Sequence, residues 1–338
     1  MLPLLFLVND IDELKPAMTT ALLMHEAAGR PVGAAVAMVD GLDVTDERIQ
    51  VRARALVKGA TVADTLAQVR AATPTVVALS DYTVALRTNP ARDLRGWAHE
   101  HLLDVLRIAA LRGVRVVNDP DALSVATSKL FLSSFPVSVR PETLVSSDPA
   151  ALRAFVAAQP GPTVLKPLHG TRGRDVFRVS GDGADQNLNA IIDVLTRQGV
   201  AMAQAWLPEG PQGDTRVVLL DGEILMAGGK PCAVQRRPPS GDFRSNVAVG
   251  GRAEAANLTD AQRTSCAIIG ERLRMLGLRL VGVDLVGHKA VELNVFSTGG
   301  LEDAGRFAGV DFIPPVIDAL LSPAGGTPAA APRDPRSP

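Results

Sequence analysis

The stretch Leu280-Val-Gly-Val-Asp284-Leu-Val-Gly-His-Lys-Ala-Val-Glu292-Leu-Asn294-Val-Phe carries the strongest structural signal of the chain. Apolar residues alternate with small or polar ones on both sides of a Gly-His-Lys break, which is typical of a β-hairpin with one apolar face. A turn over residues 287–289 would place Asp284 opposite Glu292, with Asn294 on the same face. Two carboxylates and an amide oxygen this close favour a hard cation such as Mg²⁺. The solvated face of an ordinary antiparallel sheet also carries such residues, so the hairpin alone leaves both interpretations open.

Composition excludes several classes of protein. The chain has 338 residues, enough for two or three domains, with 46% hydrophobic and 21% charged residues, as in ordinary globular proteins. Its net charge of −1 gives no electrostatic reason to expect nucleic acid or an anionic membrane as a partner. The cysteines, Cys232 and Cys266, are too few for a disulfide framework, which indicates a cytoplasmic protein. The apolar residues 1–8 are expected to form a buried strand, because no basic residue precedes them as in a signal peptide.

The first part of the chain alternates predicted strands with predicted helices, which indicates a parallel α/β domain over residues 1–118. The expected strands cover residues 4–8, 32–39, 75–80 and 114–117, and the expected helices cover 19–28 and 97–111. A further helix is expected over residues 123–134, after a segment with good helix-capping residues.

The second part of the chain is expected to be α+β, with shorter strands. Asp221-Gly222 is typical of a tight hairpin turn, and residues 259–276 predict a long helix that ends at Gly277. Residues 322–338 are rich in Pro, Ala, Gly and Ser, and we expect a disordered tail there.

Three segments are candidates for ligand binding. Lys166 ends a predicted strand before a loop that contains Gly170 and Gly173, and such a loop either cradles an anion or is an ordinary turn. The segment Gln204-Ala-Trp206-Leu207 could contact a flat base, although Trp206 could equally be a core aromatic residue. The long Pro/Gly-rich stretch 236–251 holds Arg236, Arg244 and Asn246, and is either a lid over charged ligands or a solvated loop.

In their order and spacing, these segments resemble the ATP-grasp superfamily and, more closely, the prokaryotic glutathione synthetase family. The resemblance covers about residues 3–320 and also includes Val116-Val-Asn118-Asp-Pro120, Ser128-Lys129-Leu-Phe131 and Gly213-Asp214-Thr-Arg216. It implies an N-terminal α/β pre-ATP-grasp domain at 1–118, a central subdomain with a phosphate flap at 119–201, and a C-terminal subdomain with a metal site at 202–321.

The resemblance also implies a role for each residue at a matching position. The implied ATP-binding residues are Lys129, Lys166, Gly170, Gly173, Gln204, Trp206, Leu207, Asp214 and Asn294. The implied metal ligands are Asp284, Glu292 and Asn294, and the implied catalytic residues near the transferred phosphate are Arg216 and Arg236. The implied substrate-binding residues are Arg87, Arg244, Asn246 and Ser297.

The implied activity is ATP-dependent ligation of a carboxylate to an amine through an acyl phosphate, with Mg²⁺ or Mn²⁺ as the ion. The first expectation is glutathione synthesis from γ-glutamylcysteine and glycine by a cytoplasmic homo-oligomer whose partners are small molecules. One alternative is the same chemistry on a different peptide or amino acid. Another is a non-catalytic, regulatory ATP-binding protein, although such a protein would not need the Asp284, Glu292 and Asn294 set.

The chain departs from the family pattern at three places. In the flap, Arg172 replaces a glycine and His169 stands where Asp is frequent. After the metal ligands, Phe296-Ser297-Thr-Gly-Gly300 replaces a segment that usually reads Thr-Ser-Pro-Thr. In the first domain, Arg87-Thr-Asn-Pro-Ala-Arg92 replaces Arg-Lys-Asp-Pro-Pro-Phe. The second and third changes fall where substrates are contacted, so the identity of the substrates stays open.

Overall fold

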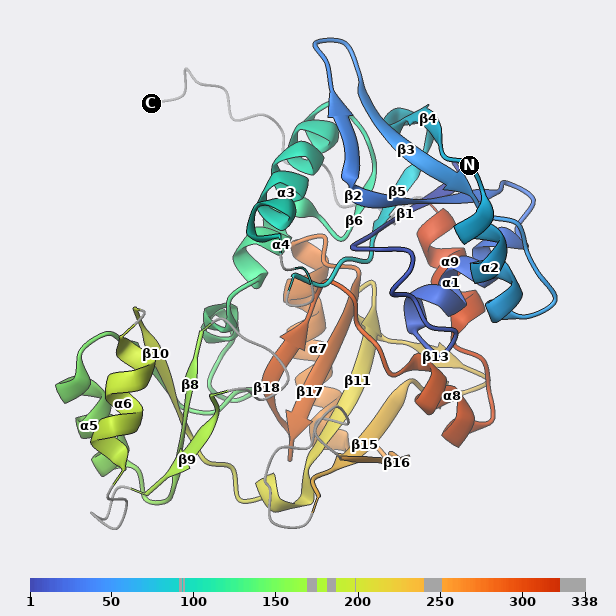
Figure 1. Cartoon of the computed structure of the whole chain (residues 1–338). Coiled ribbons are helices and arrows are strands. Elements are labelled where there is room, and N and C mark those ends of the chain that lie inside the picture. Colours follow the sequence, from blue (N-terminus) through green and yellow to red (C-terminus); the bar gives the residue numbers. More distant parts are fainter. Residues whose placement is uncertain are drawn as a thin grey trace, which may run out of the picture.

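The computed structural model describes residues 1–90, 93, 95–168, 175–180, 187–197, 199–239 and 251–322. Within these residues, three larger sheets and their helices form the molecule (Figure 1). The expected mixed architecture, α/β in the first part and α+β in the second, is confirmed. The domain boundaries given above remain predictions.

The N-terminal sheet has the strand order β4-β3-β2-β1-β5-β6. Its strands are β1 (Leu4–Val8), β2 (Ala34–Val44), β3 (Ile49–Ala55), β4 (Thr75–Ala78), β5 (Thr83–Leu86) and β6 (Val116–Val117). The β2, β1, β5 and β6 strands are parallel, whereas β3 pairs antiparallel with both β2 and β4. The sequence prediction of a parallel α/β domain therefore holds for these four strands, and the antiparallel edge formed by β3 and β4 corrects it. Both β3 and β5 were missed, because short strands carry a weak periodic signal.

Three helices accompany this sheet: α1 (Thr19–Ala28), α2 (Val62–Ala71) and α3 (Gly96–Leu111). The helix predicted over residues 123–134 is two shorter elements, α4 (Pro120–Ala126) and the 3₁₀ helix η3 (Lys129–Ser134). Ser128 separates them, because its hydroxyl caps η3 by accepting from the N–H of Leu130. This break places Lys129 at the start of a new element rather than inside a helix.

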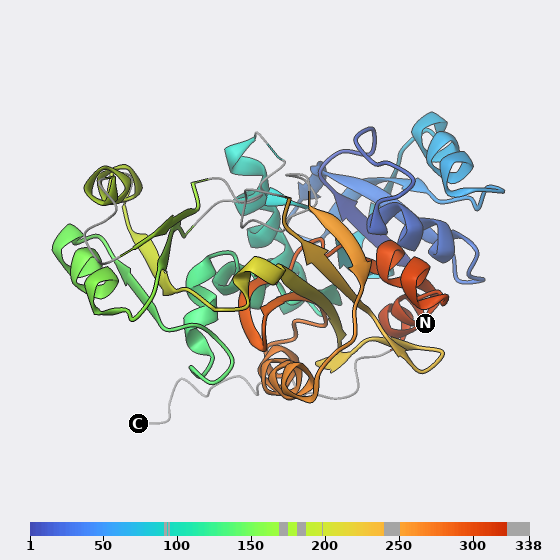
Figure 2. The same cartoon turned by 90° about the horizontal axis from the view of Figure 1, so that it is seen from below.

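A smaller four-stranded sheet forms the middle of the chain, with the order β7-β10-β8-β9. Its strands are β7 (Thr143–Ser146), β8 (Thr163–Pro167), β9 (Phe177–Val179) and β10 (Ala201–Ala205). Helices α5 (Pro149–Ala158) and α6 (Leu188–Thr196) share a separate core with one face of this sheet, which includes Leu165 and Ala203. Because side chains alternate along a strand, the next residues, Lys166 and Gln204, lie on the other face. In Figure 2 this unit lies on the opposite side of the C-terminal sheet from the N-terminal sheet.

The C-terminal sheet carries the opening hairpin and has the order β16-β15-β11-β17-β18. Its strands are β11 (Asp214–Leu220), β15 (Ala233–Arg237), β16 (Arg252–Ala255), β17 (Leu280–Val286) and β18 (Lys289–Asn294). Val217, Val281 and Val283 pack in one core with Ile269 and Leu273 of α7 (Asp260–Met275). The opposite face is therefore left for the polar residues of β11, β15, β17 and β18.

The remaining elements are short. They are η1 (Leu79–Asp81), η4 (Gly210–Gln212), β12 (Glu223–Ile224), β13 (Met226–Ala227), β14 (Lys230–Pro231), α8 (Leu301–Ala308) and α9 (Ile313–Leu321).

The C-terminal helix returns to the N-terminal domain. Helix α9 lies beside α1 in Figure 1, and Ile313 and Val316 share a core with residues of β1 and α1. Ser322, which the sequence assigned to the tail, is the C-cap of α9, and the rest of the predicted tail lies outside the described residues. In the described part of the chain, no helix combines the length and the apolar character needed to cross a membrane.

Candidate functional site

The hairpin of β17 and β18 places Asp284 directly opposite Glu292, as the alternation predicted, but through a different turn. Val286 pairs with Lys289, so the turn has two residues, and Gly287 adopts a φ of +56° there. The register then shifts between Asp284 and Leu285, which leaves Val291 as an extra residue on β18. This bulge restores the pairing that the three-residue turn had been expected to produce.

The buried side chain of Asn118 fixes both ends of this hairpin. Its amide nitrogen donates to the carbonyl oxygens of Leu280, at 3.1 Å, and Val295, at 2.6 Å. Its amide oxygen accepts from the N–H groups of Arg279, at 2.7 Å, and Leu280, at 2.9 Å. Every donor of the amide is used, so Asn118 ties the end of the N-terminal sheet to the strands that carry the polar residues.

Two arginines neutralise Asp284 in the folded chain. Arg216 and Asp284 are cross-strand partners on β11 and β17, and the guanidinium donates to both carboxylate oxygens, with 2.8 Å from Nη2 to Oδ2. Nη2 of Arg236 lies 2.8 Å from Asp284 Oδ2, and Nε of Arg236 donates to Oδ1 of Asp214 at 2.6 Å. Asp214, which the resemblance places near the ribose, is therefore paired with Arg236 here.

Asp284 remains ionised although it is only 1% exposed. Burial raises the pKa of its carboxyl group, but the nearby charges and hydrogen bonds of Arg216 and Arg236 outweigh burial and lower the pKa to about 2. The pKa of Arg236 is raised, because Asp284 and Asp214 outweigh the opposite effect of its own burial. Asp284 and Arg236 are therefore both charged at neutral pH.

Lys129 and Lys166 add two positive charges near Glu292. Lys166 lies on β8 and is buried, and its Nζ lies 3.5 Å from the carbonyl oxygen of Val291. Burial lowers the pKa of Lys166 to about 8, an effect that Glu292 opposes and Lys129 increases. Burial also lowers the pKa of Lys129, again opposed by Glu292. The four-stranded sheet and the hairpin therefore face each other across these three side chains.

The donor set fits a hard divalent cation. No group of three or more His, Cys, Asp and Glu side chains in the described part of the chain could hold a metal ion, so a cation site here depends on the amide of Asn294. Its Nδ2 lies 3.3 Å from Asp284 Oδ2, which brings the amide and the carboxylate of Asp284 together. Carboxylate and amide oxygens are the ligands that Mg²⁺ and Mn²⁺ take. Asp284, Glu292 and Asn294 would hold such an ion.

The candidate base-binding segment lies at the end of β10, where the chain passes from one sheet to the next. Gln204 is buried on the face that carries Lys166, and its Nε2 lies 3.1 Å from Thr143 Oγ1. The N–H of Trp206 donates to the carbonyl oxygen of Pro162, and the guanidinium of Arg178 lies 4.8 Å from the Trp206 ring centroid. The carbonyl oxygen of Leu207 accepts from the N–H of Gly210. Trp206 is half-buried against these groups, so part of its surface stays open.

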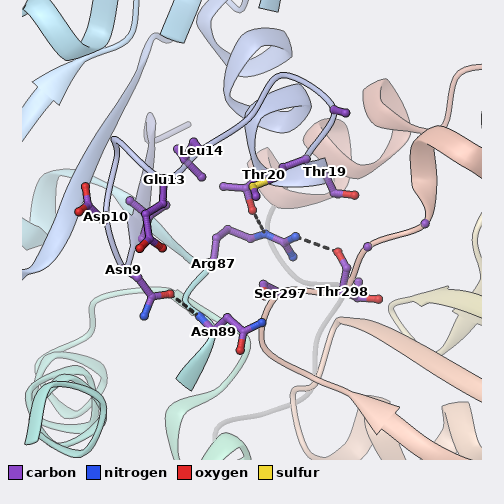
Figure 3. Close-up of a pocket in the computed structure, with 15 residues that line it drawn as sticks. Asn9, Asp10, Glu13, Leu14, Thr19, Thr20, Arg87, Asn89, Ser297 and Thr298 are labelled. Atoms are coloured by element: carbon purple, nitrogen blue, oxygen red, sulfur yellow. Dashed lines mark hydrogen bonds between the residues drawn. The ribbon is translucent and has the colours of Figure 1, made fainter. Parts of the chain in front are cut away.

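A cavity of about 220 Å³ lies between the N-terminal domain and the segment that follows β18 (Figure 3). It brings together Arg87 and Ser297, both predicted to bind substrate, although they are 210 positions apart in the sequence. Its wall includes Gly300, where an added Cβ would lie 3.5 Å from Cγ of Arg216. The cavity and the charged cluster are therefore neighbours that share the 297–300 segment as a wall.

Four predicted site residues lie outside the described residues: Gly170 and Gly173 of the flap, and Arg244 and Asn246 of the long loop. The substitution at Arg172 lies there too. The other predicted residues form three groups, namely the charged cluster, the end of β10 and the cavity.

Sequence reasoning missed several residues that shape the site. Asn118 was noted as part of a segment shared with the family but was given no role, because its four hydrogen bonds join distant parts of the chain. Thr20 and Thr298 bind Arg87, with 3.2 Å from Nε to Thr20 Oγ1 and 2.9 Å from Nη2 to the Thr298 carbonyl oxygen. The departure from the family pattern at 296–300 was the only signal that pointed toward Thr298.

Two family models match the chain. The "Prokaryotic glutathione synthetase, N-terminal domain" matches residues 2–124, and the "Prokaryotic glutathione synthetase, ATP-grasp domain" matches residues 128–309. Among the curated relatives, the glutathione synthetase of Synechococcus elongatus is 41% identical over 208 residues, which is 61% of each chain. That of Rhodopseudomonas palustris is 37% identical over 250 residues, or 73% of this chain and 75% of the relative.

The first of these alignments spans 61% of the relative's length. The alignment with the Xanthomonas campestris enzyme, at 39% identity, spans 64% of this chain and 66% of the relative.

Solved structures share the fold along nearly the whole chain. The D-cycloserine synthetase DcsG has a TM-score of 0.59 at 19% identity and covers 94% of this chain and 99% of its own. The ATP-grasp ligase PsnB with its minimal precursor has a TM-score of 0.58 at 20% identity, covering 94% and 97%. The chain therefore has the ATP-grasp fold and belongs to the prokaryotic glutathione synthetase family.

Proposed function

We propose that the chain is an ATP-dependent carboxylate–amine ligase, and that it is a glutathione synthetase that joins γ-glutamylcysteine to glycine. Membership of the family supports the reaction class. The two described cysteines are buried and unpaired, and burial raises the pKa of both thiols, which agrees with a chain that works in a reducing cytoplasm.

The observation that carries the proposal is the balance of charge between the two facing sheets. Among the described residues, the cluster holds four cations, Lys129, Lys166, Arg216 and Arg236, against three acids, Asp214, Asp284 and Glu292. Buried charge is costly unless it is paired, so a surplus of positive charge that is largely shielded from water favours an anionic ligand. A nucleoside triphosphate, with its charged phosphates, suits this surplus, and more so together with a divalent ion.

In the proposed reaction, a carboxylate oxygen of the acyl substrate attacks the γ-phosphorus of ATP, and the bond to the β-phosphate oxygen breaks to release ADP. The amine then attacks the acyl carbon, inorganic phosphate leaves, and the proton of the amine is lost to solvent. Lys129 and Lys166 hold the phosphates, and Arg216 and Arg236 stabilise the charge that develops during transfer. A divalent ion, when bound, neutralises charge on the phosphates.

Arg216 and Arg236 have a second role, because both form ion pairs with Asp284. A bound triphosphate offers both guanidinium groups new anionic partners, which would free carboxylate oxygens of Asp284 for a cation. Nucleotide and divalent ion should therefore bind cooperatively, each being weak without the other.

A different acceptor amine is the second candidate, and the cavity favours keeping it. Gly299 lines the cavity at the position where the family pattern Thr-Ser-Pro-Thr ends in a threonine. Removing this side chain enlarges the space beside Arg216, so an acceptor larger than glycine could reach the acyl phosphate. ATP hydrolysis without any acceptor would instead favour a third reaction class, that of an ATPase.

A phosphate-release screen tests the proposal and separates these candidates. The full chain is incubated with ATP, Mg²⁺ and γ-glutamylcysteine, together with glycine or each of a panel of amino acids and amines. Phosphate release that depends on both γ-glutamylcysteine and glycine supports glutathione synthesis. Release with another acceptor alone would assign the same chemistry to a different pair, and no release with any pair would contradict ligation.

Glu292→Gln tests the assignment of the cation and phosphate site. The variant keeps the size of the side chain but loses its charge, so turnover should fall by about 10²–10³-fold, the usual cost of losing one stabilising group in a transition state. Its thermal unfolding should change little, because Glu292 is only half-buried. Glu271→Gln on the exposed side of α7 is the matched control. Undiminished turnover of Glu292→Gln would contradict the assignment.

A further inference from the structure

Arg87 is a buried cation that lacks a carboxylate partner among the described residues. Arg87 lines the cavity and is 6% exposed, and its guanidinium donates to the hydroxyl of Thr20 and the carbonyl oxygen of Thr298. Burial lowers the pKa of its guanidinium to about 10, so it remains charged at neutral pH, and no nearby acid opposes that effect. Since a buried charge is costly unless an opposite charge compensates it, the surroundings of Arg87 favour an anionic ligand.

Two buried hydroxyl groups beside Arg87 also lack partners in the described structure. Oγ1 of Thr298 and Oγ1 of Thr88 are both buried and make no hydrogen bond there. Thr298 lines the cavity, whereas Thr88 follows Arg87 in the chain. Unsatisfied buried polar groups are rare in folded proteins, and they commonly await a ligand or water. Thr88 does not line the cavity, however, and Oγ1 of Thr298 lies against Gly282 of β17, so the case for a ligand in the cavity rests on Arg87 rather than on these hydroxyls.

The cavity also has an acidic side. Figure 3 shows Asp10 and Glu13 on the other side of Arg87 from Ser297 and Thr298. Oδ1 of Asp10 accepts from the N–H of Asp12 at 2.8 Å, which gives that carboxylate a role in the loop. Glu13 is exposed and forms no ion pair within the described residues, so its carboxylate is available to a ligand.

We infer that the cavity holds the zwitterionic head of the acyl substrate, with the carboxylate of that head on Arg87 and its ammonium group on Glu13. The inference rests on the proposed function and adds Glu13 as a specificity-determining residue. The cavity adjoins Arg216 through Gly300, so the other end of the peptide, whose cysteinyl carboxylate is phosphorylated, would extend from the cavity toward the site of phosphoryl transfer. The acceptor is a poor occupant of the end of the cavity near Arg87 and Glu13, because an attacking amine must be unprotonated, whereas a carboxylate such as Glu13 stabilises the protonated form. It would approach instead past Gly299 and Gly300, beside Arg216.

The test compares γ-glutamylcysteine with glutarylcysteine, which lacks only the α-ammonium group. Affinities are measured by calorimetry on the full chain, and KM values by phosphate release. The unmodified chain should prefer γ-glutamylcysteine by about tenfold, the usual value of one charge-assisted hydrogen bond. Glu13→Gln should reduce this preference to about twofold or less, mainly by weakening the binding of γ-glutamylcysteine.

Asp10→Asn is the matched control, since it removes a charge from the same loop but keeps an oxygen for the N–H of Asp12. This control should keep the tenfold preference, whereas a merely structural role of the loop would alter the affinities for both peptides equally. An unchanged preference in Glu13→Gln, or equal binding of the two peptides to the unmodified chain, overturns the inference, as does failure of γ-glutamylcysteine to bind.

The two proposals fail in different ways. Preferential binding of γ-glutamylcysteine that depends on Glu13, without phosphate release in the presence of glycine, supports the inference and contradicts the glycine reaction. Phosphate release with γ-glutamylcysteine and glycine, with no preference for the ammonium group, supports the reaction and overturns the inference.

Discussion

The charged face of the C-terminal sheet and the cavity at Arg87 differ in how their buried charges are compensated. On the sheet, Arg216 and Arg236 each lie against Asp284, and Arg236 also binds Asp214. In the cavity, Arg87 is equally shielded but binds only neutral oxygens among the described residues. The first region is internally compensated, and ligands must displace existing pairs. The second region lacks a counter-charge that a ligand can supply.

Because of this difference, the two regions should contribute differently to stability and to binding. Breaking a compensated buried pair leaves a charge stranded, whereas removing an uncompensated charge can relieve a cost. Arginine substitutions in the two regions should therefore have unlike effects on folding.

Arg216→Met should produce the largest effect. It leaves Asp284, which is 1% exposed, with one guanidinium partner instead of two, and the free energy of unfolding should fall by about 3–5 kcal/mol. Urea denaturation measures the change. Arg279→Met is the control, because its partner Asp221 has a side chain that is 44% exposed and can be hydrated after the change. An equal loss in both variants would show that Asp284 depends little on its partners.

Lys166→Met should have an intermediate effect, on nucleotide binding rather than on folding. The substitution removes a buried ammonium group from the face of the four-stranded sheet that is turned toward the hairpin. The Kd for ATP with Mg²⁺ should therefore rise by about tenfold or more. Titration calorimetry measures this value. Lys289→Met provides a comparison on β18, where the ammonium donates to the Val137 carbonyl oxygen outside the charged cluster. Unaltered affinity in Lys166→Met would remove that lysine from the phosphate site.

Arg87→Met should have the smallest effect on folding. Because no acid is left unpaired by the change, the free energy of unfolding should stay within about 1 kcal/mol of the original, or rise. The same urea experiment that measures Arg216→Met gives the comparison. A loss as large as that of Arg216→Met would mean that Arg87 has a compensating charge within the folded chain, and the contrast between the two regions would disappear.

Periodic patterns within short windows predicted most of the larger elements. The helices at α1, α3 and α7 and the strands of the hairpin lie close to their expected bounds, because each has an apolar face that a local pattern reveals. The missed strands β3 and β5 form part of the N-terminal sheet, and their place in it depends on neighbours far away in sequence. The antiparallel edge of that sheet could not be predicted for the same reason.

The candidate site, too, was predicted only where local patterns or the family resemblance marked its residues. Alternation alone placed Asp284, Glu292 and Asn294 on one face, and family resemblance marked Lys129 and Lys166. Neither indicated that Arg216 and Arg236 would neutralise Asp284, since this depends on the registers of β11 against β17 and β15.

The sequence by itself thus determined the family, the ATP-grasp fold and the set of residues suited to a nucleotide and its cation. These follow from the order of short motifs along the chain and from their spacing. Only the tertiary structure decided which charges compensate one another and which do not. Arg87 and Thr298 are far apart in the chain, and they meet in one cavity beside Arg216 because β5 and the segment after β18 end at the same place. Charge pairing depends on distances of a few ångströms, and such distances are set by packing rather than by position along the chain.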